Sequence, residues 1–185
     1  VEWGSWRPYM VDRHRAPDVA RWFTVPDEEL APLSPEQRQA IYMIEAGLNV
    51  FVTGPGGTGK SRLIEILRRH APSVSITAST GIAALNIGGS TLHRFAGLGL
   101  ATQHIGRIMD NLAASKRGED DARIRPWLST RLLVVDEAPM LTESYLIKLD
   151  RVARWVRSIY RPNRGAGQGT SGPFGGMQVV FLGEF

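Results

Sequence analysis

Four glycines, a lysine and a serine stand together in FVTGPGGTGKS, residues 51–61. Their spacing, Gly-x4-Gly-Lys-Ser, is that of a loop that binds nucleotide phosphates. In such a loop backbone N–H groups curl around phosphate oxygens, Lys60 reaches the β and γ phosphates, and Ser61 offers a hydroxyl to Mg²⁺. A chance glycine-rich turn is disfavoured, because a strand pattern precedes the loop and a helical pattern follows it. The predicted nucleotide-binding residues are Gly54, Pro55, Gly56, Gly57, Thr58, Gly59, Lys60 and Ser61.

Two adjacent acids, Asp136 and Glu137, directly follow the apolar run LLVV. Mg²⁺ prefers hard oxygen ligands, and phosphate hydrolysis needs a group that orients the attacking water. Because ligands gather at the carboxyl ends of parallel strands, we predict that Asp136 holds Mg²⁺, through Ser61 or water, and that Glu137 orients the water. A charge pair at a helix start is the alternative, which the phosphate loop disfavours. Lys60, Asp136 and Glu137 are the predicted catalytic residues, and Ser61 and Asp136 the predicted metal ligands.

Gln37 is open to two interpretations from the residues alone. Ser34 and Gln37 have the spacing of a capping box, in which each side chain accepts a hydrogen bond from the other residue's backbone N–H. That role needs no nucleotide, and the pattern alone slightly favours it. Pro35 and Gly47 suit the start and the end of a helix, so we predict one from about 35 to 46.

Apolar periodicity indicates the elements that must position these residues. Four strand patterns joined through helical segments predict an α/β fold with a parallel sheet covered on both faces. The predicted strands are LNVFVT, SVSITA, LLVV and MQVVFL. The other predicted helices are SRLIEILRRH, a short one at STGIAALN capped by Ser79 or Thr80, one through Ile105, Ile108, Met109 and Leu112, and a long one with Tyr145, Leu149, Val152, Val156 and Ile159 on one stripe.

Composition is that of one soluble domain: 185 residues, 43% hydrophobic, 22% charged and without cysteine, which excludes disulfides. The net charge is +4, and 19 of 22 cations are arginines. Arginine suits phosphate, although composition alone favours an arginine-rich solvated surface. No apolar run approaches the roughly 20 residues of a membrane span, and no signal peptide is evident, so we expect an intracellular protein without a membrane partner.

Residues 1–32 lack periodicity, which predicts an irregular arm before a domain at 33–185. Its aromatics, Trp3, Trp6, Trp22 and Phe23, could stack on bases, but packing on the domain is favoured.

Five segments together resemble the opening motifs of the Pif1 family of superfamily 1 DNA helicases, in order and at plausible intervals. The phosphate loop and the acidic pair alone would indicate only a phosphate-loop NTPase. The TASTGIAA…GGSTLH segment and the PFGG before the last strand are close to specific. The resemblance covers roughly residues 33–185, through LSPEQRQA, GPGGTGKS, TASTGIAALNIGGSTLHRFAGLGL, LLVVDEAPML and PFGGMQVVFLGEF.

This resemblance implies the N-terminal part of a first RecA-like domain that uses ATP and Mg²⁺. Gln37 occupies the position of the family's adenine-reading glutamine, a role that can coexist with the cap. The family implies binding to single-stranded DNA, 5′ to 3′ translocation, and roles in DNA repair, recombination and telomere maintenance, in the nucleus or mitochondrion of a eukaryote. The candidate DNA contacts by resemblance are Thr80, Thr91, His93 and Phe95.

The chain departs from the family pattern in three places. Residues 138–140 read Ala-Pro-Met where Ile-Ser-Met is common, and little loss is expected because Pro139 can begin a helix. Arg94 replaces a serine after His93 and could add a phosphate contact. Glu184 replaces an aspartate, and the family's γ-phosphate-sensing glutamine is missing from the sequence.

The second RecA-like domain, which supplies an arginine finger in such helicases, is also missing from these residues. Because losing an arginine finger costs about 10³ to 10⁵ in rate, the chain as given is expected to bind ATP and Mg²⁺, hydrolyse slowly and unwind nothing. Two other classes stay open: a nucleic-acid-binding module without turnover, and a phosphate-loop ATPase that acts on a protein partner. DNA-stimulated hydrolysis and salt-sensitive binding to single strands distinguish them.

Overall fold

The computed structural model describes residues 22–98, 104–114, 118, 121–160 and 172–184. Trp3, Trp6, Phe185 and residues 99–103, 115–117, 119–120 and 161–171 lie outside these ranges. Within them, a five-stranded sheet has the order β1-β5-β4-β2-β3, and every neighbouring pair is parallel. The predicted parallel sheet is therefore confirmed. The strands are β1 (Val50–Thr53), β2 (Val74–Ala78), β3 (Ser90–Thr91), β4 (Leu132–Asp136) and β5 (Gln178–Gly183).

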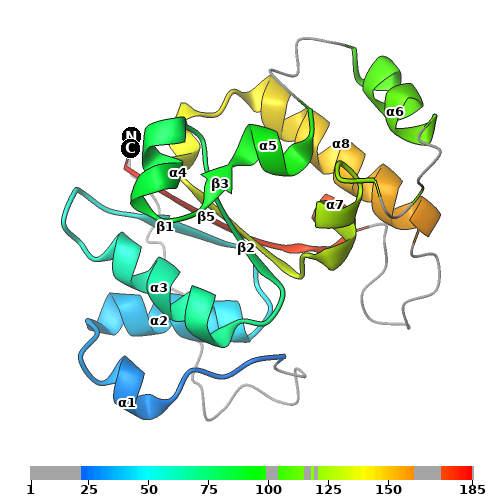
Figure 1. The fold of residues 1–185 in the computed structure, drawn as a ribbon. Helices are drawn as coiled ribbons and strands as arrows, with labels where there is room; N and C mark the ends of the chain where they lie inside the picture. The colour runs from blue at the N-terminus through cyan, green and yellow to red at the C-terminus, as the bar shows by residue number, and fades with distance from the viewer. Residues whose placement is uncertain (1–21, 99–103, 115–117, 119–120, 161–171, 185) are drawn as a thin grey trace, which may run out of the picture.

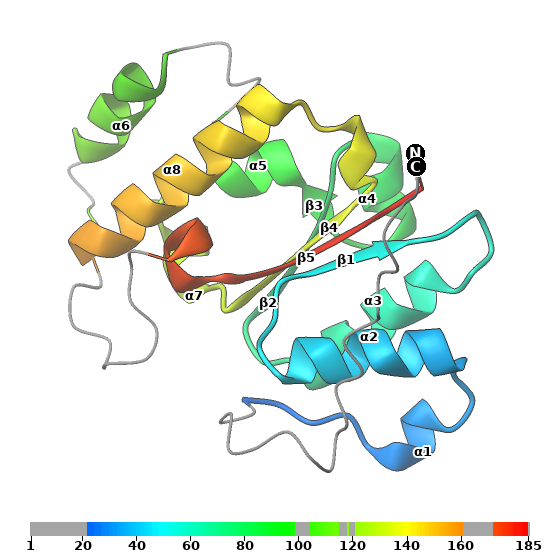
Figure 2. The ribbon, with the colours of Figure 1, turned by 180° about the vertical axis from the view of Figure 1, so that it is seen from behind.

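Helices cover both faces of the sheet, as predicted (Figures 1 and 2). α2 and α3 lie against one face with α1 beside them, and α5, α7 and α8 cover the other, with α6 outermost. Across the described residues, no helix has the length and apolar character needed to cross a membrane. The helices are α1 (Asp27–Leu30), α2 (Pro35–Glu45), α3 (Lys60–His70), α4 (Gly81–Asn86), α5 (Leu92–Ala96), α6 (Ile105–Ala113), α7 (Arg125–Ser129) and α8 (Glu143–Tyr160), with 3₁₀ turns η2 (Ala138–Met140) and η3 (Pro173–Gly176).

Strand β4 divides the interior in two, because successive side chains of a strand point to opposite faces. Leu132 and Val134 pack with α2 and α3, whereas Leu133 and Val135 pack in the cluster that includes α8. All four side chains are fully buried, as expected of an uninterrupted apolar run in a parallel sheet. The strand ends at Asp136, so the predicted acids lie at the carboxyl edge of the sheet.

Periodicity does not predict three short elements. β3 pairs two residues with β2, and α5 and α7 have five residues each. Segments of this length are too short to show a helical or strand period. The long helix α8 is confirmed, but Ile159 is exposed, so its apolar stripe ends one turn earlier, at Val156.

The described part of the N-terminal arm, residues 22–32, packs on the rest of the fold. Phe23, Val25 and Leu30 are buried in the cluster with α2 and α3. The backbone N–H of Val25 donates to Oε1 of Glu45 at 2.7 Å. This segment also forms the one-turn helix α1, where an irregular conformation is predicted. Packing on the domain therefore accounts for Phe23.

A buried arginine fixes two segments on α8. Arg157 is only 7% exposed, and its Nε donates to the carbonyl oxygen of Gly175 in η3 at 2.7 Å. Its Nη1 donates to the carbonyl oxygens of Trp127 at 2.7 Å and Thr130 at 3.2 Å, in and just after α7. Because these carbonyls satisfy the buried charge with hydrogen bonds, the guanidinium joins three stretches of chain that are remote in sequence.

Candidate functional site

The glycine-rich loop lies between β1 and α3, as predicted (Figure 1). Gly57 and Gly59 have φ angles of 81° and 84°, in the left-handed region that favours glycine. A β-carbon at Gly59 would also lie 2.2 Å from Nε2 of Gln37. Any other residue at Gly59 would strain the left-handed backbone and displace the side-chain amide of Gln37, so the conformation of the loop favours glycine here.

Lys60 begins α3 and turns its ammonium back toward the loop. Its Nζ donates to the carbonyl oxygens of Gly54 at 2.5 Å and Pro55 at 3.0 Å. The hydroxyl of Thr58 donates to the same Pro55 oxygen at 2.9 Å, and Ser61 is exposed at the first turn of α3. The loop thus places a cation and a hydroxyl at the start of a helix, an arrangement that suits phosphate and its metal.

The acidic pair ends β4. Burial raises the pKa of the Asp136 carboxyl above its ordinary value, whereas a hydrogen bond from the backbone N–H of Glu137 and the positive charge of Lys60 lower it. The opposing effect of Lys60 means that the cation of the loop and the Asp136 carboxylate interact electrostatically. Glu137 is exposed and has a left-handed backbone, with φ of 53°. Such a conformation is uncommon for a residue with a side chain, and it is enriched at functional sites.

The end of β5 packs against the turn that follows the acids. A β-carbon at Gly183 would lie 2.2 Å from Cδ of Pro139 and 2.7 Å from its Cγ. The missing side chain of Gly183 therefore lets β5 approach η2 closely. Glu184 is exposed just beyond this contact. Sequence periodicity gives no sign of this contact, because it joins residues 44 positions apart.

Gln37 forms the predicted capping box and also contacts the loop. Its Oε1 accepts from the backbone N–H of Ser34 at 3.0 Å, while Ser34 Oγ accepts from the Gln37 N–H at 3.2 Å. Its Nε2 donates to the carbonyl oxygen of Thr58 at 2.8 Å. The side-chain amide thus links α2 to the phosphate loop, beside the cap, and a role in reading adenine stays a prediction.

The two predicted DNA-contacting threonines both cap helices. Thr80 Oγ1 accepts from the N–H of Ala83 at 3.2 Å at the start of α4. Thr91 Oγ1 accepts from the N–H of Arg94 at 3.2 Å at the start of α5. Neither residue is fully buried, so each hydroxyl keeps a second lone pair and its proton for another partner. Of the two predicted caps for α4, Thr80 is therefore correct and Ser79 is not.

The two predicted aromatic DNA contacts differ in exposure. The half-buried ring of His93 lies 4.6 Å from that of Tyr145, whose own pKa burial raises to about 12. The ring of Phe95 is 6% exposed and packs 5.2 Å from Trp127 in the core. A base has no access to the face of Phe95 in this conformation, because α7 covers it, so Phe95 serves as a core residue.

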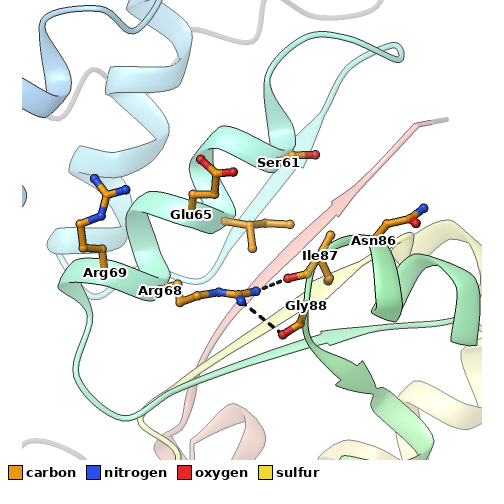
Figure 3. Close-up of a pocket in the computed structure, with 8 residues that line it drawn as sticks. Ser61, Glu65, Arg68, Arg69, Asn86, Ile87 and Gly88 are labelled. Carbon is orange, nitrogen blue, oxygen red and sulfur yellow. Dashed lines mark hydrogen bonds between the residues drawn. The ribbon is translucent and has the colours of Figure 1, made fainter.

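A cleft of about 530 Å³ lies between α3 and the end of α4 (Figure 3). Arg68 crosses it from α3 and donates to the carbonyl oxygens of Ile87 and, at 3.2 Å, Gly88. These bonds tie the end of α4 to the helix that begins with Lys60. The exposed face of α4 carries Ile82 and Leu85, which are 77% and 81% exposed. The sequence gives no signal for Arg68, because its acceptors are backbone groups some 20 residues away.

The phosphate loop, the start of α4 and the end of β5 lie at one edge of the sheet (Figures 1 and 2). A protein-family model described as PIF1-like helicase matches residues 32–185, which is most of this chain. The chain belongs to the PIF1-like helicase family. It is 39% identical over 159 residues to the ATP-dependent DNA helicase PIF1 of Saccharomyces cerevisiae, covering 83% of this chain and 17% of that protein.

Solved Pif1 helicases share this fold. The crystal structure from Candida albicans matches with a TM-score of 0.67 and 35% identity, over 83% of this chain and 33% of the other. The Bacteroides Pif1 helicase in complex with ADP-AlF3 and single-stranded DNA matches with a TM-score of 0.63 and 28% identity, over 82% and 32%. The match confirms the predicted RecA-like fold. The chain spans 17% of the length of the yeast relative and about a third of each of these solved chains.

Proposed function

We propose that this chain is the N-terminal part of the first RecA-like motor domain of an ATP-dependent DNA helicase. The observation that carries the proposal is the meeting of a phosphate loop and an acidic pair at one edge of a parallel sheet, in a chain of a helicase family. Because the chain spans only 17% of its yeast relative, the activity belongs to the full-length protein. A second RecA-like domain is proposed to lie in the remainder.

The residues of the loop and of β4 fit ATP and Mg²⁺. The backbone N–H groups of Gly54 and of residues 56–59 would bind phosphate oxygens, and Lys60 would neutralise the β and γ phosphates. Ser61 and Asp136 would hold Mg²⁺, which supplies charge stabilisation during phosphoryl transfer. Glu137 would orient and deprotonate the attacking water. The left-handed loop glycines and the exposed carboxylate of Glu137 support these roles.

Single-stranded DNA is the proposed second ligand, on the side of α4 and α5. Thr80, Thr91 and His93 remain the proposed contacts, because each has exposed surface and a group that can reach phosphate. The single-stranded DNA in the solved Bacteroides Pif1 helicase supports a DNA ligand. Adenine reading by Gln37, 5′ to 3′ direction, roles in repair, recombination and telomere maintenance, and residence in the nucleus or mitochondrion are further parts of the proposal that come from the family.

The test compares ATP hydrolysis by the full-length protein with and without single-stranded DNA, alongside the Glu137→Gln variant. We expect DNA to stimulate hydrolysis and the variant to lose about 10² to 10⁴ in rate while still binding nucleotide, because only water activation is removed. Glu143→Gln, in the first turn of α8, is the matched control and should hydrolyse normally.

Two results would contradict the proposed helicase function. Salt-sensitive DNA binding without DNA-stimulated hydrolysis would identify a nucleic-acid-binding module. Hydrolysis without salt-sensitive affinity for single strands would favour an ATPase that acts on a protein partner, since phosphate contacts must weaken as salt rises.

A further inference from the structure

Ser79 lies beside the acid proposed to hold the metal. β2 and β4 pair in parallel with Ala78 opposite Asp136. The backbone N–H of Ser79 extends this pairing by donating to the carbonyl oxygen of Asp136 at 3.0 Å. Ser79 is thus attached to the Asp136 backbone at the carboxyl edge of the sheet, where the proposed nucleotide site lies.

The hydroxyl of Ser79 differs from its neighbours along β2. Ser75 Oγ lies 2.7 Å from Thr130 Oγ1, Thr77 Oγ1 donates to the carbonyl oxygen of Val134 at 2.7 Å, and Thr80 caps α4. Ser79 Oγ is buried and has no hydrogen-bond partner in the part of the chain that the structure describes. Since a buried hydroxyl without a partner is costly, native proteins retain one chiefly where water, an ion or a catalytic task satisfies it.

The surroundings of Ser79 indicate which task applies. The neighbouring Asp136 carboxyl is partly buried and interacts with the charge of Lys60. A carboxylate that binds a metal is normally oriented by a hydrogen bond from an outer group, and such partners tune metal affinity. A serine hydroxyl can donate to a carboxylate through one ordered water, and the pairing of β2 with β4 places Ser79 next to Asp136 at the edge of the sheet.

We propose that Ser79 is a positioning residue of the nucleotide site: its hydroxyl, through one ordered water, orients the Asp136 carboxylate that holds Mg²⁺. The inference rests on the proposed function and adds a residue to it. Ser79 immediately precedes Thr80 and α4, and Arg68 ties the other end of α4 to α3. The candidate DNA-binding helix is therefore attached to both the acid and the phosphate-loop side of the site.

The test measures binding of a fluorescent, nonhydrolysable ATP analogue to the full-length protein, with Mg²⁺ and with a chelator. We expect Ser79→Ala to weaken the Mg²⁺-dependent affinity about 10- to 100-fold, the usual range for groups that orient metal ligands, and to leave metal-free binding unchanged. Ser79→Thr keeps the hydroxyl and should restore most of the affinity. The melting temperature of Ser79→Ala should not fall, because the lost hydroxyl has no protein partner in the described structure.

Ser75→Ala is the matched control, because it removes a hydroxyl near the start of β2, the strand that leads to Ser79. It should lower the melting temperature and leave the Mg²⁺ dependence unchanged. If Ser79→Ala binds the analogue with the Mg²⁺ dependence of the natural protein, Ser79 has no positioning role and the proposed function stands. If the natural protein itself binds no analogue with Mg²⁺, the proposed function and this inference both fail.

Discussion

The phosphate-loop side of the molecule and the α4–α5 side carry their candidate residues differently. In the loop, Gly57 and Gly59 adopt left-handed backbones and Lys60 turns back to the loop, so the arrangement of the residues expected to bind phosphate is set largely within the loop itself. On the other side, Thr80 caps a helix and Phe95 lies in the core. A backbone-directed site is thus recognisable in a short motif, whereas a side-chain surface depends on what the rest of the fold packs against it.

Replacing Lys60 by alanine tests the loop side and should have the largest effect. In the full-length protein, Lys60→Ala should lower the rate of ATP hydrolysis about 10²- to 10³-fold, because it removes the cation placed to neutralise developing phosphate charge. Steady-state hydrolysis in the presence of single-stranded DNA measures this. Lys148→Ala on α8 removes the same charge far along the chain and should be neutral. Equal losses in both variants would mean that Lys60 acts only through net charge.

The close contact between β5 and η2 predicts a loss of stability in Gly183→Ala. The added β-carbon would meet Pro139 at 2.2 Å, and overpacking of this kind costs about 1 to 3 kcal/mol. Thermal unfolding measures the effect. Gly81→Ala is the control, since a β-carbon there meets nothing within 4 Å and alanine favours the helix. An unchanged melting temperature in Gly183→Ala would show that the turn after the acids can move freely.

Two substitutions at Thr80 separate its cap from a DNA contact. Thr80→Ala should cost about 1 kcal/mol of stability, because the cap of α4 is lost. Thr80→Asp keeps a capping oxygen but brings a negative charge to the proposed DNA surface. It should retain stability and weaken affinity for single-stranded DNA roughly fivefold, since a like-charge contact at a surface costs on the order of 1 kcal/mol. Fluorescence anisotropy with a labelled oligonucleotide would measure this, and unchanged affinity would exclude α4 from the DNA surface.

The smallest expected effect concerns the attachment of α1 to the phosphate-loop helix. Glu29 accepts from Arg69 at 2.5 Å and contacts His70 at 3.1 Å, and these hydrogen bonds lower the pKa of its carboxyl. A lowered folded-state pKa means that the stabilisation is present above the unfolded pKa and is lost as pH falls through the folded value. Glu29→Gln should therefore flatten the acid side of a melting-temperature profile, whereas Glu28→Gln, at an exposed neighbour, should not. If the two variants gave melting temperatures with the same dependence on pH, the proposed contribution of Glu29 to stability would be wrong.

The features that the sequence predicts are those set by neighbouring residues, and the features that it does not predict are contacts between residues distant in the chain. The strand before the loop, the capping box at Ser34 and the burial of β4 depend on neighbours in sequence, and the residues alone predict them. The bond from Arg68 to the end of α4 depends on the folded path of the chain, as does the contact of Gly183 with Pro139. Neither contact produces a periodic pattern of residues in the sequence. The resemblance placed Phe95 in a DNA-binding segment but could not show that α7 would cover its ring.

The buried guanidinium of Arg157 has a consequence for how this domain can be altered. Because arginine stays protonated at any pH that proteins tolerate, its bonds to three backbone carbonyls cannot be relieved by losing the charge. Removing either acceptor segment by truncation, circular permutation or loop grafting would leave a cation in the interior without its oxygens. The stretch from α7 to η3 should therefore be transplanted only as a unit, and lysine cannot replace this arginine, since a single ammonium lacks the fork that reaches both segments.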